Sequence, residues 1–378
     1  VPALKDAGIP VRAVDIEPST ERFDALARYH VKKLLGEGGM GAVYLGEQQM
    51  GTKVRNVAIK TLHKHLSQDP HIKARFMREC GTVSELEHPN TIQVYDYGSS
   101  DDGLLYIVME YVQGQDVATV LEKTGPMPPE RVQRILTQVC GSLEEAHKKG
   151  IVHRDLKPEN VVLCERAGQT DWVEVLDFGI AKRQEDSDPN EQKLTQQGMV
   201  LGTPPYMSPE QFTGQKLKGT SDIYSLAIVA YEMLTGQLPF TASTPWEWAT
   251  KHLTQAPAPL ESFPEGAALA TNKRNAIMRA LSKNRDERYV SVIEFMQEFT
   301  GLADPQAAWT MATSAGMKGA GISSSQVAAA MSAGAPAGAM GTAHTQPQQA
   351  VNASQMAYGA PQQGYGAPGY PSPPYGQS

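Results

Sequence analysis

The sequence has little cysteine, and its cysteines are widely spaced. The 378 residues include 3 cysteines, Cys80, Cys140 and Cys164. A disulfide-built secreted domain uses many more, and these spacings fit neither a disulfide framework nor a CxxC metal site. We therefore expect partly buried thiols in a reducing compartment, which indicates a cytoplasmic location.

Long apolar runs are also missing. No window approaches the ~18 consecutive apolar residues that a membrane span requires, because polar side chains interrupt even the stretch 223–234. The N-terminal segment VPALKDAGIPVRAVD has no long apolar core. We therefore expect neither a membrane span in this chain nor a signal peptide. The chain begins with Val rather than Met, which leaves open whether a piece precedes it.

An excess of positive charge is absent as well. The chain has 34 Lys and Arg against 41 Asp and Glu, a net charge of -7. This balance argues against a protein whose main task is to bind nucleic acid or an anionic membrane. We expect no nucleic-acid partner.

The C-terminal part of the chain has almost no charge of either sign. From residue 305 onward Lys318 is the only charged side chain. Residues 303–378 are rich in Ala, Gly, Pro, Gln and Tyr, and YGAP occurs at 358–361 and again at 365–368. Such a composition buries too little apolar surface to offset the entropy of ordering, so we predict a disordered tail. A Pro-rich ligand or a weakly self-associating segment is the alternative, and the tail's partner is unknown.

The remaining sequence divides into a strand-rich part and a helical part. Residues 29–36, 42–47, 54–63, 92–97 and 104–111 have strand patterns, and residues 70–86 have helix signals. After Gly114 the pattern turns helical, with amphipathic runs at 129–149, 220–235 and 273–281. This layout predicts an α+β fold, with a small sheet domain, a helical domain and a cleft between them.

A glycine-rich motif lies between the first two expected strands. Residues 36–43 read GEGGMGAV and fit G-x-G-x-x-G-x-V. Glycines let backbone N–H groups approach phosphate oxygens without a Cβ in the way. A dinucleotide site needs a helix directly after the glycines, but the strand-like AVYLGE follows here. The motif alone is weak, because a flexible hairpin would look the same.

A lysine lies in a run suited to a buried strand. Lys60 ends the string VAIK, and a buried ammonium group needs an anionic partner or ligand. Glu79, on the helix expected at 70–86, could face that strand and pair with Lys60. Taken alone, a solvated edge lysine and a solvated helix carboxylate are the default interpretations.

The strongest indication of function is a pair of sequence motifs that lie close together in the chain. HRDLKPEN covers residues 153–160, and DFG follows at 177–179, at the end of an apolar strand. Asp155 would lie where a substrate hydroxyl can reach it, and Lys157 could neutralise a transferring phosphoryl group. Asn160 and Asp177 offer the oxygen ligands that Mg²⁺ prefers.

Together these strings carry a resemblance to a known family. GEGGMGAV, VAIK, HRDLKPEN, DFG and SPE, in this order, resemble the signature set of protein kinases. LGEGGMGAVYLG and LGTPPYMSPEQ are similar to the bacterial eukaryotic-type (Hanks-type) serine/threonine kinases. The resemblance implies a two-lobed kinase domain at 29–302, with the N-lobe at about 29–111 and the C-lobe at about 112–302. An extension at 1–28 and the tail lie outside it.

The resemblance also implies roles for individual residues. Asp155, Lys157, Lys60 and Glu79 would be catalytic, with Glu79 orienting Lys60. Asn160 and Asp177 would bind Mg²⁺, with Mn²⁺ as a possible substitute. ATP would contact Leu35, Gly36, Glu37, Gly38, Gly39, Met40, Gly41, Ala42, Val43, Ala58, Lys60, Met109, Glu110 and Val112.

Further residues resemble supporting and regulatory positions. Asp222 resembles the aspartate that steadies the catalytic loop, and Arg288 resembles the arginine that pairs with Glu210. Thr195 lies eight residues before Thr203, where related bacterial kinases carry an autophosphorylated threonine. We therefore expect a regulatory phosphate at Thr195.

The sequence as a whole predicts a serine/threonine protein kinase that transfers the ATP γ-phosphoryl group to protein hydroxyls. Its partners would be ATP and protein substrates. One alternative is an ATP-binding signalling scaffold that acts through the tail, against which the intact Asp155, Asn160 and Asp177 speak. A small-molecule phosphotransferase is the other, and the string GTPPYMSPE argues against it.

Overall fold

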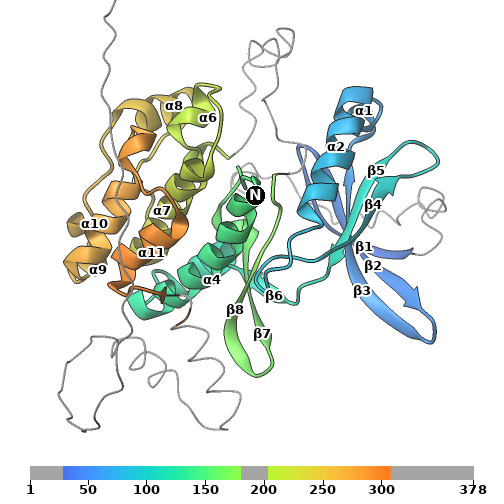
Figure 1. The fold of residues 1–378 in the computed structure, drawn as a ribbon, viewed down its shortest axis with the longest axis horizontal. Coiled ribbons are helices and arrows are strands. Elements are labelled where there is room, and N and C mark those ends of the chain that lie inside the picture. Colours follow the sequence, from blue (N-terminus) through green and yellow to red (C-terminus); the bar gives the residue numbers. More distant parts are fainter. Residues whose placement is uncertain (1–28, 180–202, 306, 308–378) are drawn as a thin grey trace, which may run out of the picture. The chain divides into compact units, whose positions relative to one another are not determined.

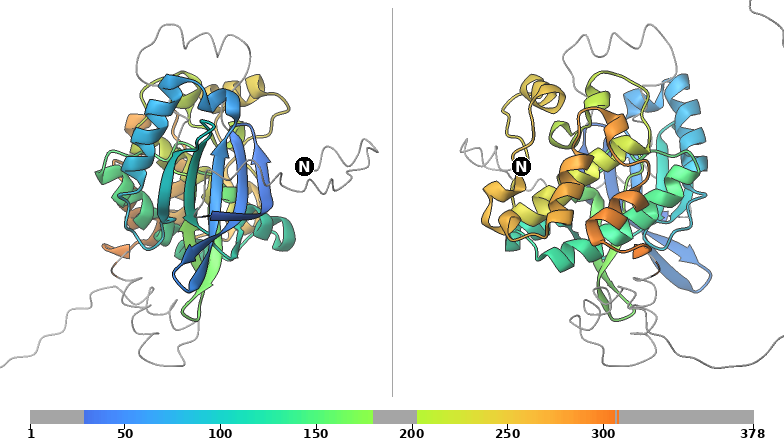
Figure 2. Two further views of the ribbon diagram at one scale, coloured as in Figure 1. Left: turned by 90° about the vertical axis from the view of Figure 1, so that its right-hand side faces the viewer. Right: turned by 60° about the vertical axis from the view of Figure 1, so that its left-hand side comes forward.

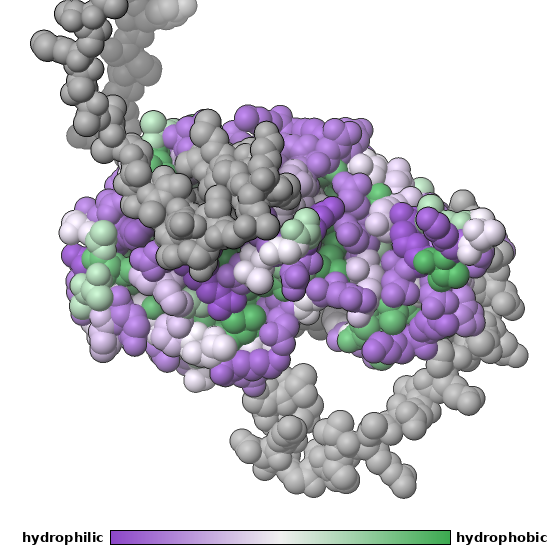
Figure 3. Space-filling model, turned by 90° about the horizontal axis from the view of Figure 1, so that it is seen from below, coloured by the Kyte–Doolittle hydropathy of each residue, from purple (hydrophilic) through white to green (hydrophobic). Residues whose placement is uncertain are grey.

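The computed structural model describes residues 29–179, 203–305 and 307. The chain divides into two units, Val1–Gly334 and Ala335–Ser378, and every described residue belongs to the first. The described residues are drawn as the coloured ribbon in Figure 1. Within the described ranges, no helix is long and apolar enough to cross a membrane. Seen from below, the described surface is mainly hydrophilic with scattered hydrophobic residues (Figure 3).

The N-terminal lobe is built on an antiparallel sheet of five strands in the order β1-β2-β3-β5-β4. The strands are β1 (Tyr29–Gly38), β2 (Gly41–Met50), β3 (Lys53–Leu62), β4 (Val94–Ser99) and β5 (Leu105–Glu110). Alternation along β3 gives the sheet two apolar faces, because Val57 and Ile59 join one buried cluster while Ala58 and Leu62 join another. This alternation leaves Lys60 on the same face as Ala58.

Helix α2 covers the face of the sheet that carries Ala58 (Figure 2). It spans Pro70–Val83 after the short helix α1 (Lys64–Ser67), and the Asp69 side chain caps it by accepting from two backbone N–H groups. Phe76 and Cys80, one turn apart, are fully buried in the cluster on that face. Burial raises the pKa of the Cys80 thiol to about 12, so it remains protonated.

The C-terminal lobe packs its helices around α7. Nearly all of α7 is buried, including Tyr224 and Tyr231. The helices are α3 (Val117–Thr124), α4 (Pro129–Lys148), α6 (Pro209–Phe212), α7 (Gly219–Thr235), α8 (Pro245–Thr254), α9 (Pro264–Ala267), α10 (Thr271–Ala280) and α11 (Val292–Thr300). Short 3-10 helices are η4 (Pro158–Asn160), η5 (Pro204–Tyr206), η6 (Leu260–Ser262) and η7 (Arg285–Glu287).

A small antiparallel sheet corrects the expectation that the chain is helical after Gly114. Its order is β6-β7-β8, with strands β6 (Gly114–Asp116), β7 (Val161–Arg166) and β8 (Gln169–Val175). The turn between β7 and β8 places Ala167 and Gly168 at positive φ, a tight hairpin that the non-glycine Ala167 does not signal in the sequence. The β7–β8 hairpin joins the two sequence motifs, because HRDLKPEN precedes β7 and DFG follows β8.

Candidate active site

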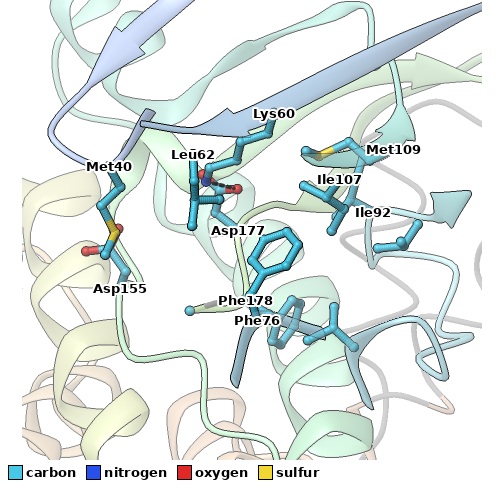
Figure 4. A pocket seen from close by; sticks show the side chains of 13 residues that line it. Met40, Lys60, Leu62, Phe76, Ile92, Ile107, Met109, Asp155, Asp177 and Phe178 are labelled. Atoms are coloured by element: carbon cyan, nitrogen blue, oxygen red, sulfur yellow. Dashed lines mark hydrogen bonds and ion pairs between the residues drawn. The ribbon is translucent and has the colours of Figure 1, made fainter. Parts of the chain in front are cut away.

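A pocket lies where the five-stranded sheet, α2 and the DFG segment meet (Figure 4). Of the residues predicted to bind ATP, metal or substrate, it is lined by Met40, Lys60, Met109, Asp155 and Asp177. Phe178 and Gly179 of the DFG motif also line the pocket, and the lining residues that no motif indicated are Leu62, Phe76, Val83, Ile92, Val94 and Ile107. Alternation on β5 and the helical period of α2 would have indicated several of these as buried, but not that they share a cavity.

Lys60 and Asp177 form an ion pair in this pocket. Lys60 Nζ lies 2.7 Å from Asp177 Oδ1 (Figure 4). Asp177 has a φ of 54°, an unusual value for a residue other than glycine, as the chain leaves β8. Gly179 N donates to His153 O at 2.9 Å, and a Cβ on Gly179 would lie 2.7 Å from that same oxygen. Glycine is therefore required for the DFG segment to lie this close to the HRD segment.

The predicted pair between Lys60 and Glu79 is wrong for this structure. Among the described ion pairs, Lys60 joins Asp177, whereas Glu79 Oε1 lies 4.0 Å from Arg154 NH1. Both members of the Glu79–Arg154 pair are largely buried. The helical period gives the face of α2 on which Glu79 lies, but the position of the whole helix along and across the sheet depends on packing that the sequence does not reveal.

Asp222 anchors the HRD segment. The carboxylate of this fully buried residue on α7 accepts from His153 N at 2.8 Å and Arg154 N at 2.9 Å, and it contacts His147 Nε2 at 2.7 Å. Burial opposes its ionisation, but the hydrogen bond and charge of His147 outweigh burial and hold the pKa of Asp222 below its ordinary value. The predicted supporting role of Asp222 is confirmed.

Asp155, Lys157 and Thr203 meet at the mouth of the site. Thr203 Oγ1 donates to Asp155 Oδ1 at 3.3 Å, and Lys157 Nζ donates to Thr203 Oγ1 at 3.2 Å. Lys157 Nζ also lies 3.7 Å from Asp155 Oδ2. Asn160 Nδ2 donates to Asp155 O at 2.7 Å, which ties the loop to η4. A carboxylate that faces both a hydroxyl and a cation is suited to accept a proton from a hydroxyl.

Several of the residues predicted to contact ATP belong to one apolar cluster. Ala58 and Met109 are buried there, and Val43 and Val112 pack against them. Glu110 ends β5, and its backbone N–H donates to Gln93 O at 2.9 Å. Leu35 is more open, with 41% of its surface exposed on β1. The strands thus bring the apolar residues together and leave the glycine motif at the edge of the sheet.

The buried pair of Glu210 and Arg288 supports the segment after Thr203. Arg288 donates to both carboxylate oxygens of Glu210, at 2.7 and 3.0 Å, as predicted. Burial acts against the charged carboxylate, but Arg288 outweighs it and holds the pKa of Glu210 below its ordinary value. The predicted phosphorylation site Thr195 lies outside the described residues.

Comparisons with known proteins agree with this geometry. The model of the family described as "Protein kinase domain" matches residues 29–298. Serine/threonine-protein kinase pkn3 of Myxococcus xanthus is 44% identical over 271 residues, which are 72% of this chain and 49% of pkn3. PknB of Mycobacterium tuberculosis is 38% identical over 270 residues, which are 71% of this chain and 41% of PknB. This chain thus spans about half, or less, of the length of these relatives.

A solved structure gives the same result for the fold. The crystal structure of the Mycobacterium tuberculosis PknI kinase domain is 30% identical, with a TM-score of 0.55, and the match covers 73% of this chain and 96% of that one. The predicted two-lobed fold and the predicted resemblance to bacterial serine/threonine kinases are confirmed. The chain belongs to the protein kinase domain family.

Proposed function

We propose that this chain transfers the γ-phosphoryl group of ATP to serine or threonine hydroxyls of proteins. The observation that carries the proposal is the contact of Asp155 with a hydroxyl and a lysine, close to the Lys60–Asp177 pair. Thr203 already places a threonine hydroxyl within hydrogen-bond reach of Asp155. A substrate hydroxyl in a similar position could give its proton to Asp155, while Lys157 would balance charge on the phosphoryl group.

The residues present fit ATP. Val43, Ala58, Met109 and Val112 form an apolar cluster of the kind that accepts a flat base. Beyond it, Lys60 points into the pocket, where its ammonium group is suited to phosphate oxygens (Figure 4). The glycine motif at the β1–β2 turn would cover those phosphates with backbone N–H groups.

The donor set also fits a magnesium ion. Asn160 uses Nδ2 to donate to Asp155 O, so its Oδ1 is the atom that could face a cation. Asp177 supplies a carboxylate in the pocket, and Asn160 adjoins the pocket through its bond to Asp155. The described residues include no cluster of three or more His, Cys, Asp or Glu side chains suited to a metal. Mg²⁺ does not need one, because it is commonly held by one or two protein ligands together with phosphates and water, and it neutralises phosphate charge there. Mn²⁺ accepts the same oxygen ligands.

Activation by phosphate at Thr195 would act through Arg154. In this structure Arg154 faces Glu79, and Lys60 faces Asp177. A phosphothreonine adds about -1.5 to -2 charges and strong acceptors for a guanidinium group. We infer that it would draw Arg154 away from Glu79 and leave Glu79 to pair with Lys60 after a shift of α2. Phosphosite mapping of active protein, together with the kinetics of Thr195→Ala, tests this. An unphosphorylated Thr195 and full activity of the variant would contradict it.

The activity itself is tested with ATP that carries a radiolabel on its γ-phosphate. The purified chain, Mg²⁺, this labelled ATP and a mixed protein substrate should give labelled phosphoserine or phosphothreonine on acid hydrolysis, and a chelator should abolish the label. ATP binding without transfer would instead support the signalling-scaffold alternative. Label that appears only on small molecules would support a small-molecule phosphotransferase.

A further inference from the structure

The tip of the glycine motif is held by a side chain outside the motif. His63 directly follows β3, and its backbone N–H donates to Met40 O at 2.9 Å. Its side-chain Nε2 lies 2.9 Å from Gly38 O. Because a carbonyl oxygen can only accept, His63 carries a proton on Nε2 when it makes this bond. Both bonds come from one residue, so His63 ties the tip of the motif to the end of β3.

The peptide between Gly38 and Gly39 lies in open space at the end of β1, where Gly38 pairs with Gly41. A Cβ built on either glycine would meet no atom within 4 Å. Two adjacent glycines also have the widest choice of backbone angles, which lets the peptide plane between them turn over. Gly41 is different, because a Cβ there would lie 1.7 Å from Thr61 O. Packing therefore fixes the motif at Gly41, whereas the two hydrogen bonds from His63 hold it at Gly38 and Met40.

The orientation of this peptide decides where its N–H group points. A trans peptide is planar, and its C=O and N–H groups point in opposite directions. A hydrogen bond from His63 to Gly38 O therefore fixes the direction of Gly39 N–H as well. The same tip places Met40 in the pocket near Asp155 (Figure 4). His63 thus holds both a potential phosphate donor and the backbone of Met40, a residue that lines the pocket.

We propose that His63 is a positioning residue for phosphoryl transfer, which orients the Gly38–Gly39 peptide for the phosphates of ATP. This inference rests on the proposed function. Histidine suits the task because Nε2 donates both in the protonated ring and in one neutral tautomer. The neighbouring His65 stacks on the His63 ring, with centroids 5.8 Å apart, and serves as a matched control because it is a histidine beside the same turn.

The test compares the affinity for ATP with the affinity for adenosine, which has no phosphates. Full-length protein is titrated calorimetrically with each ligand in Mg²⁺ buffer, as wild type, His63→Leu, His63→Gln and the control His65→Leu. His63→Leu should weaken ATP binding roughly five- to tenfold, the usual effect of losing one hydrogen bond. Adenosine affinity should stay unchanged, and KM for ATP should rise in parallel. Glutamine, whose amide nitrogen reaches about as far as Nε2, should restore most of the ATP affinity, and His65→Leu should match wild type.

Other results would contradict either the role of His63 or the proposed function, and the two cases can be told apart. Equal weakening of ATP and adenosine, or unchanged ATP affinity in His63→Leu, would overturn the role of His63. Should His63→Leu not fold, His63→Asn and His63→Gln provide the matched pair, because only Gln reaches Gly38 O. Equal ATP affinities for these two variants would also overturn it. A wild-type protein that binds no ATP would refute the proposed function instead.

Discussion

At the scale of single residues, two strained backbone positions lie at the candidate site, and two more lie in the β7–β8 hairpin. Among the described residues other than glycine, only four have positive φ, and two of them are Arg154 of the HRD segment and Asp177 of the DFG segment. Such conformations persist only where surrounding contacts fix them. Asp222 does this for Arg154 through its backbone N–H, and the Lys60 ion pair holds the side chain of Asp177. At Arg154 and Asp177 the strain therefore lies where the structure is organised for chemistry.

Removing Arg288 should destabilise the protein far more than removing a surface arginine. The guanidinium of Arg288 is fully buried, so Arg288→Ala would leave the Glu210 carboxylate buried without its cation. Loss of one partner of such a pair typically costs about 3–5 kcal/mol in the free energy of unfolding. Arg285→Ala is the control, because Arg285 is partly exposed and its side chain donates to the backbone oxygen of Lys216 rather than to a buried carboxylate. Urea unfolding measures both, and a loss below about 1 kcal/mol for Arg288→Ala would contradict this account.

Residue identities could be predicted from the sequence better than residue partners. The motif strings were sufficient to select Asp155, Asp177 and Lys60, and the structure brings all three to one pocket. The partner of Glu79 could not be predicted, because it depends on where α2 lies relative to the sheet. The local sequence pattern shows that Phe76 and Cys80 face the sheet, but it does not determine the position of the helix along it.

At the scale of elements, sequence periodicity predicted the long helices and the five-stranded sheet of the N-terminal lobe. The predicted helices at 129–149 and 220–235 correspond to α4 and α7. The strand before DFG was predicted and corresponds to β8, but β6, β7 and the sheet that the three strands form were missed. β6 has only three residues, and β7 is too short for its alternation to stand out from the helical sequence around it. Tertiary pairing with β8, rather than local preference, makes these segments strands.

The β7–β8 hairpin should make stability depend on pH. The buried Glu174 accepts from Arg166 and Trp172, but burial, reinforced by Glu110, raises its pKa from 4.5 to about 7. Between these values the folded protein binds more protons than the unfolded chain, so stability falls as pH rises from about 5 to 7. Glu174→Gln should remove this slope while keeping an acceptor for both donors. Thermal unfolding at pH 5, 6, 7 and 8 measures it.

The exposed Glu165 provides the control for that experiment. It lies on β7, the other strand of the hairpin, and Glu165→Gln should leave the pH dependence of the melting temperature as in wild type. A Glu174→Gln protein whose melting temperature still falls across this range as steeply as wild type would place the titrating group elsewhere.

At the scale of the whole molecule, the kinase domain should not depend on the C-terminal segment. The composition of residues 308–378 predicts little packing against the domain. Deleting them should therefore change the melting temperature by no more than about 2 °C and leave activity on a generic substrate unchanged. Deletion from residue 299 is the contrasting variant, because it removes the fully buried Phe299 and should lower stability strongly. A large loss of stability in the first deletion would show that the segment docks on the domain.

The central claim is that Asp155 accepts the proton of a substrate hydroxyl in a kinase reaction. The most direct measurement is the rate of phosphoryl transfer by Asp155→Asn, alongside its affinity for ATP. Asparagine keeps the shape and the contact with Thr203 but is not a base, so the rate should fall by about two to four orders of magnitude. ATP affinity and melting temperature should remain close to wild type. A rate equal to wild type, in protein free of contaminating kinase, would contradict the account.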